Sequence, residues 1–201
     1  GFFPIEDLQG FRTLGSHLQG HPAMHKTPGI DMSTGALGHG VSVALGMALA
    51  AKISQKDYWT YVMTGEGCLN EGQTWEALMM AGKYKPERLV LMVDYNRVQL
   101  DGTAAEIMPL DPLADKLKAF GWNVADTVYN GHDTNDILAS FAWMDQSGPW
   151  PKAVVYSTVK GKGVSFMEGK SAWHGAPIDE KSYQEGRVQL EADLEHKEAS
   201  L

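Results

Sequence analysis

Two short polar segments about thirty residues apart carry side chains that suit metal chemistry. The first is Thr64–Gly67 (TGEG), in which the glycines let backbone N–H groups approach a ligand and the Glu66 carboxylate can hold a cation. The second is Asp94–Val98 (DYNRV), which contributes the amide of Asn96. Two oxygen side chains and a backbone carbonyl make half of an octahedral magnesium shell, which phosphate oxygens and water usually complete. TGEG alone is more simply a turn with a solvated glutamate, and the Asn96 partner reverses that preference.

Each segment follows a predicted strand, so the fold is expected to bring them together. Residues 58–63 form a short apolar and aromatic run. Residues 88–94 (RLVLMVD) are almost continuously apolar, which is typical of a strand buried on both faces of a parallel sheet. A helix is predicted between them at Glu71–Tyr84. Ligands of open parallel sheets bind beyond the carboxyl ends of the strands, and there Glu66 and Asn96 would meet.

The rest of the chain continues the alternation of strands and helices. Further helices are predicted at residues 5–14, 41–53, 112–120, 133–145 and 178–198, and further strands at residues 122–129 and 152–159. A long ordered loop precedes the second helix, and such loops are usually functional. These elements predict an α/β fold, an open, mostly parallel sheet with helices on both faces, in a single domain over residues 1–201. Gly1–Pro4 reads as the interior of a longer chain, so a truncated N-terminus is expected.

The composition excludes several classes of protein. Of 201 residues, 43% are hydrophobic and 21% charged, as in ordinary globular domains. The formal net charge of −8 argues against nucleic acid as a partner, because phosphate backbones are bound by clustered Lys and Arg. No apolar run is long enough to cross a membrane, so no membrane association is expected. The single cysteine, Cys68, allows no internal disulfide, and a cytoplasmic location is expected.

Five segments resemble a known enzyme family. Gly65-Glu66-Gly67 followed by Asn96 is similar to the thiamine diphosphate fingerprint, in which GDG precedes an asparagine about thirty residues later. The segments that resemble transketolase, in the family's order, are FRTLGSHLQGHP (11–22), STGALGHG (33–40), EGQTWEAL (71–78), VDYNRVQLDG (93–102) and WHGAPI (173–178). The similarity runs from about residue 2 to residue 186. It implies the diphosphate-binding (PP) domain of a thiamine diphosphate enzyme, with thiamine diphosphate and Mg²⁺ as cofactors.

The resemblance implies a metal and diphosphate site. Glu66, the Asn96 side chain and the Val98 carbonyl match the magnesium ligands of the family, and Gly67 matches its backbone contact to the diphosphate. The family has aspartate where this chain has Glu66, which is one methylene longer. A displacement of about 1 Å at a positioned group can cost about a hundredfold in rate.

The resemblance also implies residues for the cofactor rings, the substrate and a subunit interface. Gly35 and Leu37 match positions beside the aminopyrimidine and thiazolium rings. His21 matches a histidine that contacts the donor ketose. His174 matches a histidine near the diphosphate and the reacting carbons. Glu71 matches an interface glutamate in a proton network between paired active sites. Histidine suits proton transfer because its pKa lies near neutrality.

Transketolase chemistry passes a two-carbon ketol unit from a ketose to an aldose, and it requires a second domain. No segment here matches the pyrimidine-binding domain, which supplies a glutamate to the cofactor. The resemblance therefore implies the N-terminal subunit of a split transketolase. It would act on phosphorylated or otherwise anionic sugars, paired two plus two with the C-terminal transketolase subunit. Two alternatives stay open: a catalytically silent paralogue that only binds the partner, and a deoxyxylulose-phosphate-synthase-like enzyme, which the GHP and HGAP segments disfavour.

The remaining notable residues have plainer interpretations. Histidines without a matching motif are expected at the surface: His17, His25, His132 and His196. Residues of the helix after the phosphate loop are expected in the core or at an interface: Trp75, Met79 and Met80. Cys68 is interpreted as a packing residue, and Lys160–Gly163 as a flexible strap over the cofactor. His39 stands where the family has glutamine, and contact with the cofactor mouth and simple packing are equally favoured for it.

Overall fold

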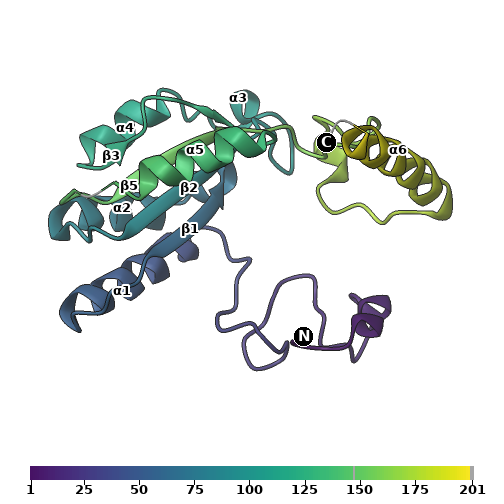
Figure 1. Cartoon of the computed structure of the whole chain (residues 1–201), viewed down its shortest axis with the longest axis horizontal. Helices are drawn as coiled ribbons and strands as arrows, with labels where there is room; N and C mark the ends of the chain where they lie inside the picture. Colours follow the sequence, from purple (N-terminus) through teal and green to yellow (C-terminus); the bar gives the residue numbers. More distant parts are fainter. Residues whose placement is uncertain (147, 200–201) are drawn as a thin grey trace.

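A five-stranded parallel sheet forms the centre of the molecule (Figure 1). The computed structural model describes residues 1–146 and 148–199. The strands are β1 (Thr60–Gly65), β2 (Leu89–Tyr95), β3 (Asn123–Val124), β4 (Tyr129–Asn130) and β5 (Lys152–Ser157). Their order is β1-β2-β5-β3, with β4 also paired to β5, and every pair of these strands is parallel. The predicted α/β class is confirmed.

Helices connect the strands and cover both faces of the sheet. The α-helices are α1 (His39–Ile53), α2 (Gly72–Tyr84), α3 (Ala104–Ile107), α4 (Leu113–Ala119), α5 (Thr134–Met144) and α6 (Glu180–Glu198). The 3₁₀ helices are η1 (Ile5–Gly10), η2 (Glu66–Asn70) and η3 (Ser171–Trp173). Helices α1, α2 and α4 share a core with one face of the sheet, and α5 shares a second core with the other. Within the described chain, no helix combines the length and apolar character needed to span a membrane.

Strand β2 shows why both faces need cover. Successive side chains of a strand point to opposite faces. Leu89, Leu91 and Val93 join the core with α1, α2 and α4, whereas Val90 and Met92 join the core with α5. None of the five is more than 8% exposed. Burial on both faces explains the continuous apolar run that predicted this strand.

The predicted strand at residues 122–129 is wrong in form, because the chain makes two short strands there. Val124 of β3 pairs with Ala153 and Tyr129 of β4 pairs with Tyr156. Val124 and Tyr129 are thus five positions apart in the sequence, whereas their partners Ala153 and Tyr156 in β5 are only three apart. The N–H of Ala125 still donates to the Ala153 carbonyl, but residues 126–128 leave the pairing, so that β5 pairs first with β3 and then with β4.

Two local elements of the structure also differ from the prediction. The helix predicted at residues 5–14 is the six-residue η1, and it ends before Arg12, which has a left-handed φ of 60° that a continuing helix excludes. Helix α3 was not predicted. It is one turn long and is held by a capping box between Thr103 and Glu106, a signal that TxxE in the sequence did contain.

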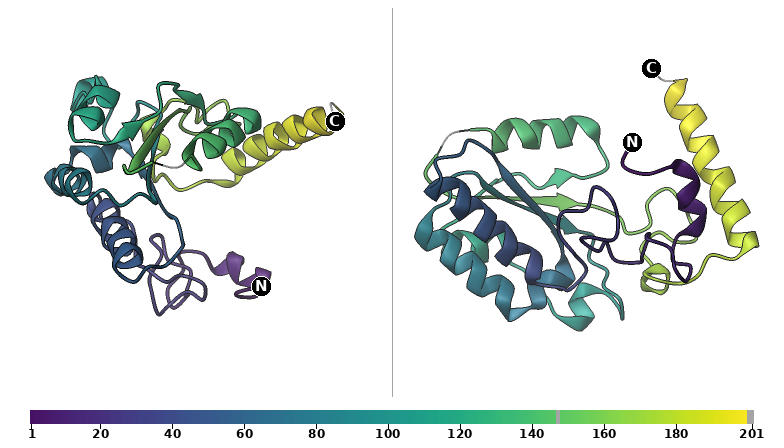
Figure 2. Two further views of the ribbon diagram at one scale, coloured as in Figure 1. Left: turned by 60° about the vertical axis from the view of Figure 1, so that its left-hand side comes forward. Right: turned by 90° about the horizontal axis from the view of Figure 1, so that it is seen from below.

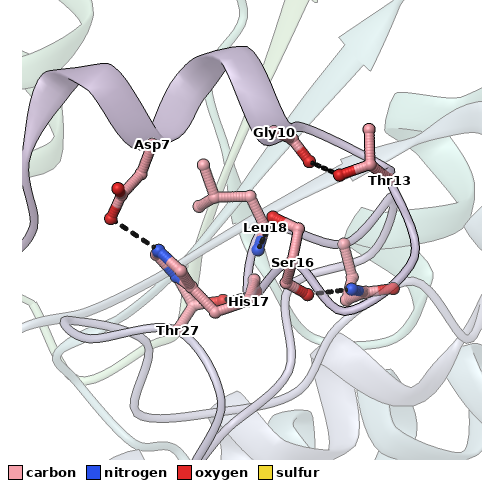
Figure 3. Close-up of polar contacts among 8 residues, drawn as sticks. Asp7, Gly10, Thr13, Ser16, His17, Leu18 and Thr27 are labelled. Carbon is pink, nitrogen blue, oxygen red and sulfur yellow. Dashed lines mark hydrogen bonds and ion pairs between the residues drawn. The ribbon is translucent and has the colours of Figure 1, made fainter.

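The first 38 residues, irregular apart from η1, lie outside the layered sheet and helices (Figures 1 and 2). Local polar contacts hold it. The His17 ring points to the Asp7 carboxylate, with Nε2 2.9 Å from Oδ2 (Figure 3). The Thr27 hydroxyl donates to the His17 carbonyl at 2.6 Å. The surface placement predicted for His17 is therefore wrong, since its half-buried ring joins η1 to the following loop.

Of the other packing predictions, some are confirmed and some are wrong. His25, His132 and His196 are exposed as predicted. Trp75 packs against the larger core, but Met79 and Met80 are exposed on α2. Core placement is thus wrong for these two methionines because they lie on the face of α2 that points away from the sheet, and their place at an interface stays a prediction.

Candidate active site

The carboxyl ends of β1, β2 and β5 border a cavity of about 560 Å³. Gly65 at the end of β1 pairs with Asp94 of β2, and Asp94 pairs with Tyr156 of β5. The loops that follow these strands therefore start side by side, as the open parallel sheet predicts. Six of the residues predicted to contact the metal, the cofactor or the substrate line the cavity: Leu37, Glu66, Gly67, Asn96, Val98 and His174.

Glu66 is the most unusual of these residues. It begins η2 and is only 3% exposed, and both of its carboxylate oxygens are buried without a hydrogen-bond partner. Burial raises the pKa of Glu66, and the nearby carboxylates of Asp94 and Asp111 raise it further. The backbone N–H of Arg97 and the charge of its guanidinium lower this pKa in part. A buried carboxylate in this setting needs a positive partner.

Asn96 and Val98 add two further oxygen atoms that can act as metal ligands. The Val98 N–H donates to Asn96 Oδ1 at 2.9 Å, and Asn96 Nδ2 donates to Asp94 Oδ1 at 3.3 Å. The neighbouring backbone groups are occupied, since Ala104 N–H donates to the Arg97 carbonyl at 2.9 Å. Among the described residues no hydrogen bond uses the Val98 carbonyl, so this oxygen can accept a ligand.

The donors fit a hard divalent cation that brings its own ligands. Across residues 1–146 and 148–199, no group of three or more His, Cys, Asp or Glu side chains could hold a metal ion. One carboxylate, one amide oxygen and one carbonyl leave about half of an octahedral shell open. That arrangement suits Mg²⁺ bound together with phosphate oxygens and water, and the unpartnered carboxylate of Glu66 is the group that such an ion would neutralise.

Lys160 and His174 bring positive and donor groups to the same cavity. Lys160 Nζ lies 2.7 Å from His174 Nδ1. A charged lysine can only donate, so Nδ1 accepts and the proton of the neutral ring lies on Nε2. Burial lowers the pKa of Lys160, while the carboxylates of Asp94 and Glu66 raise it. The pair thus offers a cationic group and an N–H donor to an anionic ligand.

The turn after β5 is held by contacts that the sequence did not reveal. His132 Nε2 accepts the Val159 N–H at 2.7 Å, and His132 also lines the cavity. Gly161 has a φ of 72°, and a Cβ there would lie 2.8 Å from the Met167 carbonyl oxygen. Lys160 and Gly161 of the predicted strap therefore lie at the cavity wall, and the role of Lys160–Gly163 as a cover for the cofactor stays a prediction.

His21 and Gly35 lie against each other in the N-terminal loop. Gly35 has a φ of 109°, and a Cβ there would lie 2.5 Å from His21 Nδ1, so only glycine permits this approach. Gly35 lines an adjoining apolar cavity of about 650 Å³, together with Leu37 and His39. Leu37 lines both cavities and connects them.

Glu71 lies outside the lining of both cavities. It is the N-terminal flanking residue of α2, and a Cβ on Gly38 would lie 2.7 Å from its Cβ. Glu71 therefore packs on the loop that carries Leu37, and its place in an interface network stays a prediction. Cys68 lines both cavities and is partly buried.

Sequence reasoning assigned nothing to Asp94 and Thr158, which are part of this site. The Thr158 hydroxyl donates a hydrogen bond to the carboxylate of Asp94, and both residues line the cavity. A single charged residue near the end of the apolar run of β2, two positions before Asn96, was the signal available.

Comparison with known proteins identifies the family. The family model described as "Transketolase, thiamine diphosphate binding domain" matches residues 2–198. The chain belongs to the transketolase family. Thiamine diphosphate with a divalent metal such as Mg²⁺ is accordingly the cofactor of this transketolase domain.

Two of the relatives are subunits of transketolases that consist of more than one chain. The chain is 42% identical over 196 residues to one of the subunits of the apulose-4-phosphate transketolase of Phocaeicola vulgatus, and the match covers 97% of this chain and 68% of that protein. It is 41% identical over 193 residues to the SqwG subunit of the 6-deoxy-6-sulfo-D-fructose transketolase of a Clostridium species, and this match covers 96% of this chain and 70% of that protein. The crystal structure of transketolase from Campylobacter jejuni superimposes with a TM-score of 0.84 at 31% identity, covering 92% of this chain and 30% of that one. This transketolase chain thus spans about two thirds of the subunits and about a third of the larger enzyme.

Proposed function

We propose that this chain is the diphosphate-binding subunit of a two-chain transketolase, which transfers a two-carbon ketol unit from a ketose to an aldose. The observation that carries the proposal is the buried, unpartnered carboxylate of Glu66 in one cavity with Asn96, Val98 and His174. Such a group needs a cation, and the open half of its shell suits a diphosphate.

In this proposal the chain holds the cofactor and positions protons. Glu66, the Asn96 amide and the Val98 carbonyl hold the divalent ion, and the Gly67 N–H contacts the diphosphate. The Nε2–H of His174 donates to an anionic oxygen in the cavity. When bound, thiamine diphosphate supplies a nucleophilic carbon and an electron sink for breaking the bond beside a ketone.

The other predicted residues serve the rings, the donor sugar and the partner. Gly35 and Leu37 line the cofactor rings, and His21 beside Gly35 is placed to contact the donor ketose. Glu71 takes part in the network between paired active sites. A glycine at position 35 is required for the His21 contact, since any side chain there would collide with the imidazole.

Activity in this proposal needs a partner subunit that carries the pyrimidine-binding domain, in a two-plus-two assembly in the cytoplasm. The similar proteins named as transketolase subunits support this division of labour. Their names refer to a sugar phosphate and a sulfo-sugar, which supports phosphorylated or otherwise anionic sugars as substrates.

The test is reconstitution. The chain is mixed with its partner, thiamine diphosphate and Mg²⁺, and ketol transfer is measured with a panel of ketose phosphates and sulfo-ketoses. Transfer that requires both chains and is lost in Glu66→Ala and His174→Ala supports the proposal. Metal-dependent cofactor binding without transfer from any anionic ketose would contradict it.

A catalytically silent paralogue is the second candidate, and Glu66 favours it because the family has the shorter aspartate there. The variant Glu66→Asp separates the two. If the native chain binds cofactor weakly and is inactive while Glu66→Asp gains both properties, the silent candidate is the better description. A deoxyxylulose-phosphate-synthase-like activity has less support, since the matching family model and the relatives described above are transketolases.

A further inference from the structure

We propose that Asp94 is a positioning residue that determines which end of the Asn96 amide faces the divalent cation. The inference rests on the metal site of the proposed function. It assigns a role to a carboxylate that is neither one of the proposed ligands nor a contact of the substrate.

Asp94 is placed where it can act on Asn96. It belongs to the central part of the sheet, since β2 pairs with β1 on one side and with β5 on the other. Its half-buried carboxylate lines the cavity. Thr158 follows β5, and its hydroxyl donates a hydrogen bond to Asp94 Oδ1. The neighbouring strand thus holds the carboxylate in one position.

The two ends of the Asn96 amide have opposite partners. At one end, Asp94 Oδ1 accepts at 3.3 Å, and because a carboxylate can only accept, that end must be the NH₂ group. At the other end, the Val98 N–H donates at 2.9 Å, so that end must be the oxygen. A carbonyl oxygen has two acceptor sites, and one stays open for a cation.

Without Asp94 the amide loses one of its two discriminating partners, and only the Val98 N–H still selects the oxygen. A rotation of the side chain that turns the NH₂ group to the place of the oxygen would then cost only the Val98 contact, and NH₂ cannot bind a cation. Groups that orient a metal ligand typically contribute 10–100-fold to metal affinity. Asp94 also carries a charge close to the site, so the orienting effect must be separated from the effect of charge.

The comparison of Asp94→Ala with Asp94→Asn separates them. Both variants remove the charge, but only Asp94→Asn keeps an oxygen that can accept from Thr158 and from the Asn96 NH₂ group. The probe is Mn²⁺ with inorganic pyrophosphate, which requires no pyrimidine-binding partner. Binding to the full chain is measured by electron paramagnetic resonance. We expect Asp94→Ala to bind at least tenfold more weakly than Asp94→Asn.

A second background tests the orientation itself. In Asn96→Asp the ligand has an oxygen at both ends, so no orientation is needed. The difference between Asp94→Ala and Asp94→Asn is expected to shrink there to about twofold, the size of ordinary deviations from additivity. Asp101→Ala, in an exposed position of the loop after β2, is the matched control and is expected to bind like the native chain.

The outcomes are distinct. A difference below tenfold in the native background, or a difference that persists in Asn96→Asp, would overturn the role of Asp94 and leave the metal site intact. Failure of the native chain to bind Mn²⁺ and pyrophosphate, with Glu66→Ala unchanged, would overturn the metal site and this role together. If circular dichroism shows that Asp94→Ala does not fold, Thr158→Val against Thr158→Ser takes its place, and equal affinities of that pair would overturn the role.

Discussion

Replacing Glu66 by glutamine is expected to stabilise the metal-free fold while removing its response to a cation and diphosphate. Glu66 is 3% exposed, both of its carboxylate oxygens lack a hydrogen-bond partner, and Asp94 and Asp111 add repulsion that Arg97 offsets only in part. A protein that pays for this arrangement in stability is expected to recover the loss only when a cation binds.

The expected magnitude follows from the burial of the group. A buried polar group without a partner costs about 1–3 kcal/mol, and more when it is charged. Glutamine keeps the shape and some of the polarity, so we expect the metal-free variant to gain about 1–2 kcal/mol of unfolding free energy. For a chain of this size that corresponds to a rise in Tm of about 2–8 °C.

The assay is thermal unfolding followed by circular dichroism, first with a chelator and then with Mg²⁺ and pyrophosphate. Ligands at about 100 times Kd stabilise the native chain by about 2.7 kcal/mol, or about 5–11 °C, and Glu66→Gln is expected to show little of this shift. Without metal, the difference in unfolding free energy between Glu66→Gln and the native chain also depends on pH. Because the folded-state pKa of Glu66 is raised, its destabilising effect is absent below the ordinary glutamate pKa of about 4.3 and grows as pH rises toward 7.

Glu76→Gln is the matched control, because this residue is exposed on α2. Its unfolding free energy is expected to stay within about 0.5 kcal/mol of the native value at every pH. If Glu66→Gln were less stable than the native chain without metal, or if its advantage were the same at pH 4 and pH 7, the Glu66 carboxylate would not be the destabilising buried group described above.

Two further predictions concern the fold. A Cβ on Gly82 would lie 1.9 Å from the Phe120 carbonyl oxygen, so Gly82→Ala is expected to lower the unfolding free energy by about 3 kcal/mol in urea titrations. Gly46 has open space around it in α1, so Gly46→Ala is expected to raise the unfolding free energy by about 0.5–1 kcal/mol. Equal effects of the two substitutions would refute the close approach of α2 to the end of α4. The Asp133 side chain accepts from Asn135 N and from the next backbone N–H at the start of α5, so Asp133→Ala is expected to cost about 1 kcal/mol and Asp133→Ser much less, as measured by the same titration.

Much of the architecture could be predicted from the sequence because it depends on local patterns. The apolar run at residues 88–94 predicts a strand buried on both faces, and β2 has that burial. Glu66 and Asn96 each follow a strand, and parallel neighbours end at one edge, so their proximity follows from the alternation of strands and helices. The family resemblance also depended only on short ordered segments, and the match over residues 2–198 confirmed it.

Tertiary structure decided what depends on distant partners. Thr158 meets Asp94 across 64 positions, and His132 meets the Val159 N–H across 27. Neither contact has a periodic signal, because it arises where β2, β5 and their loops are packed side by side. The division of residues 122–129 into β3 and β4 likewise depends on register with β5. Patterns in the chain determine which segments form strands and which residues follow them, whereas the direction and burial of each side chain are set by the neighbours that folding brings.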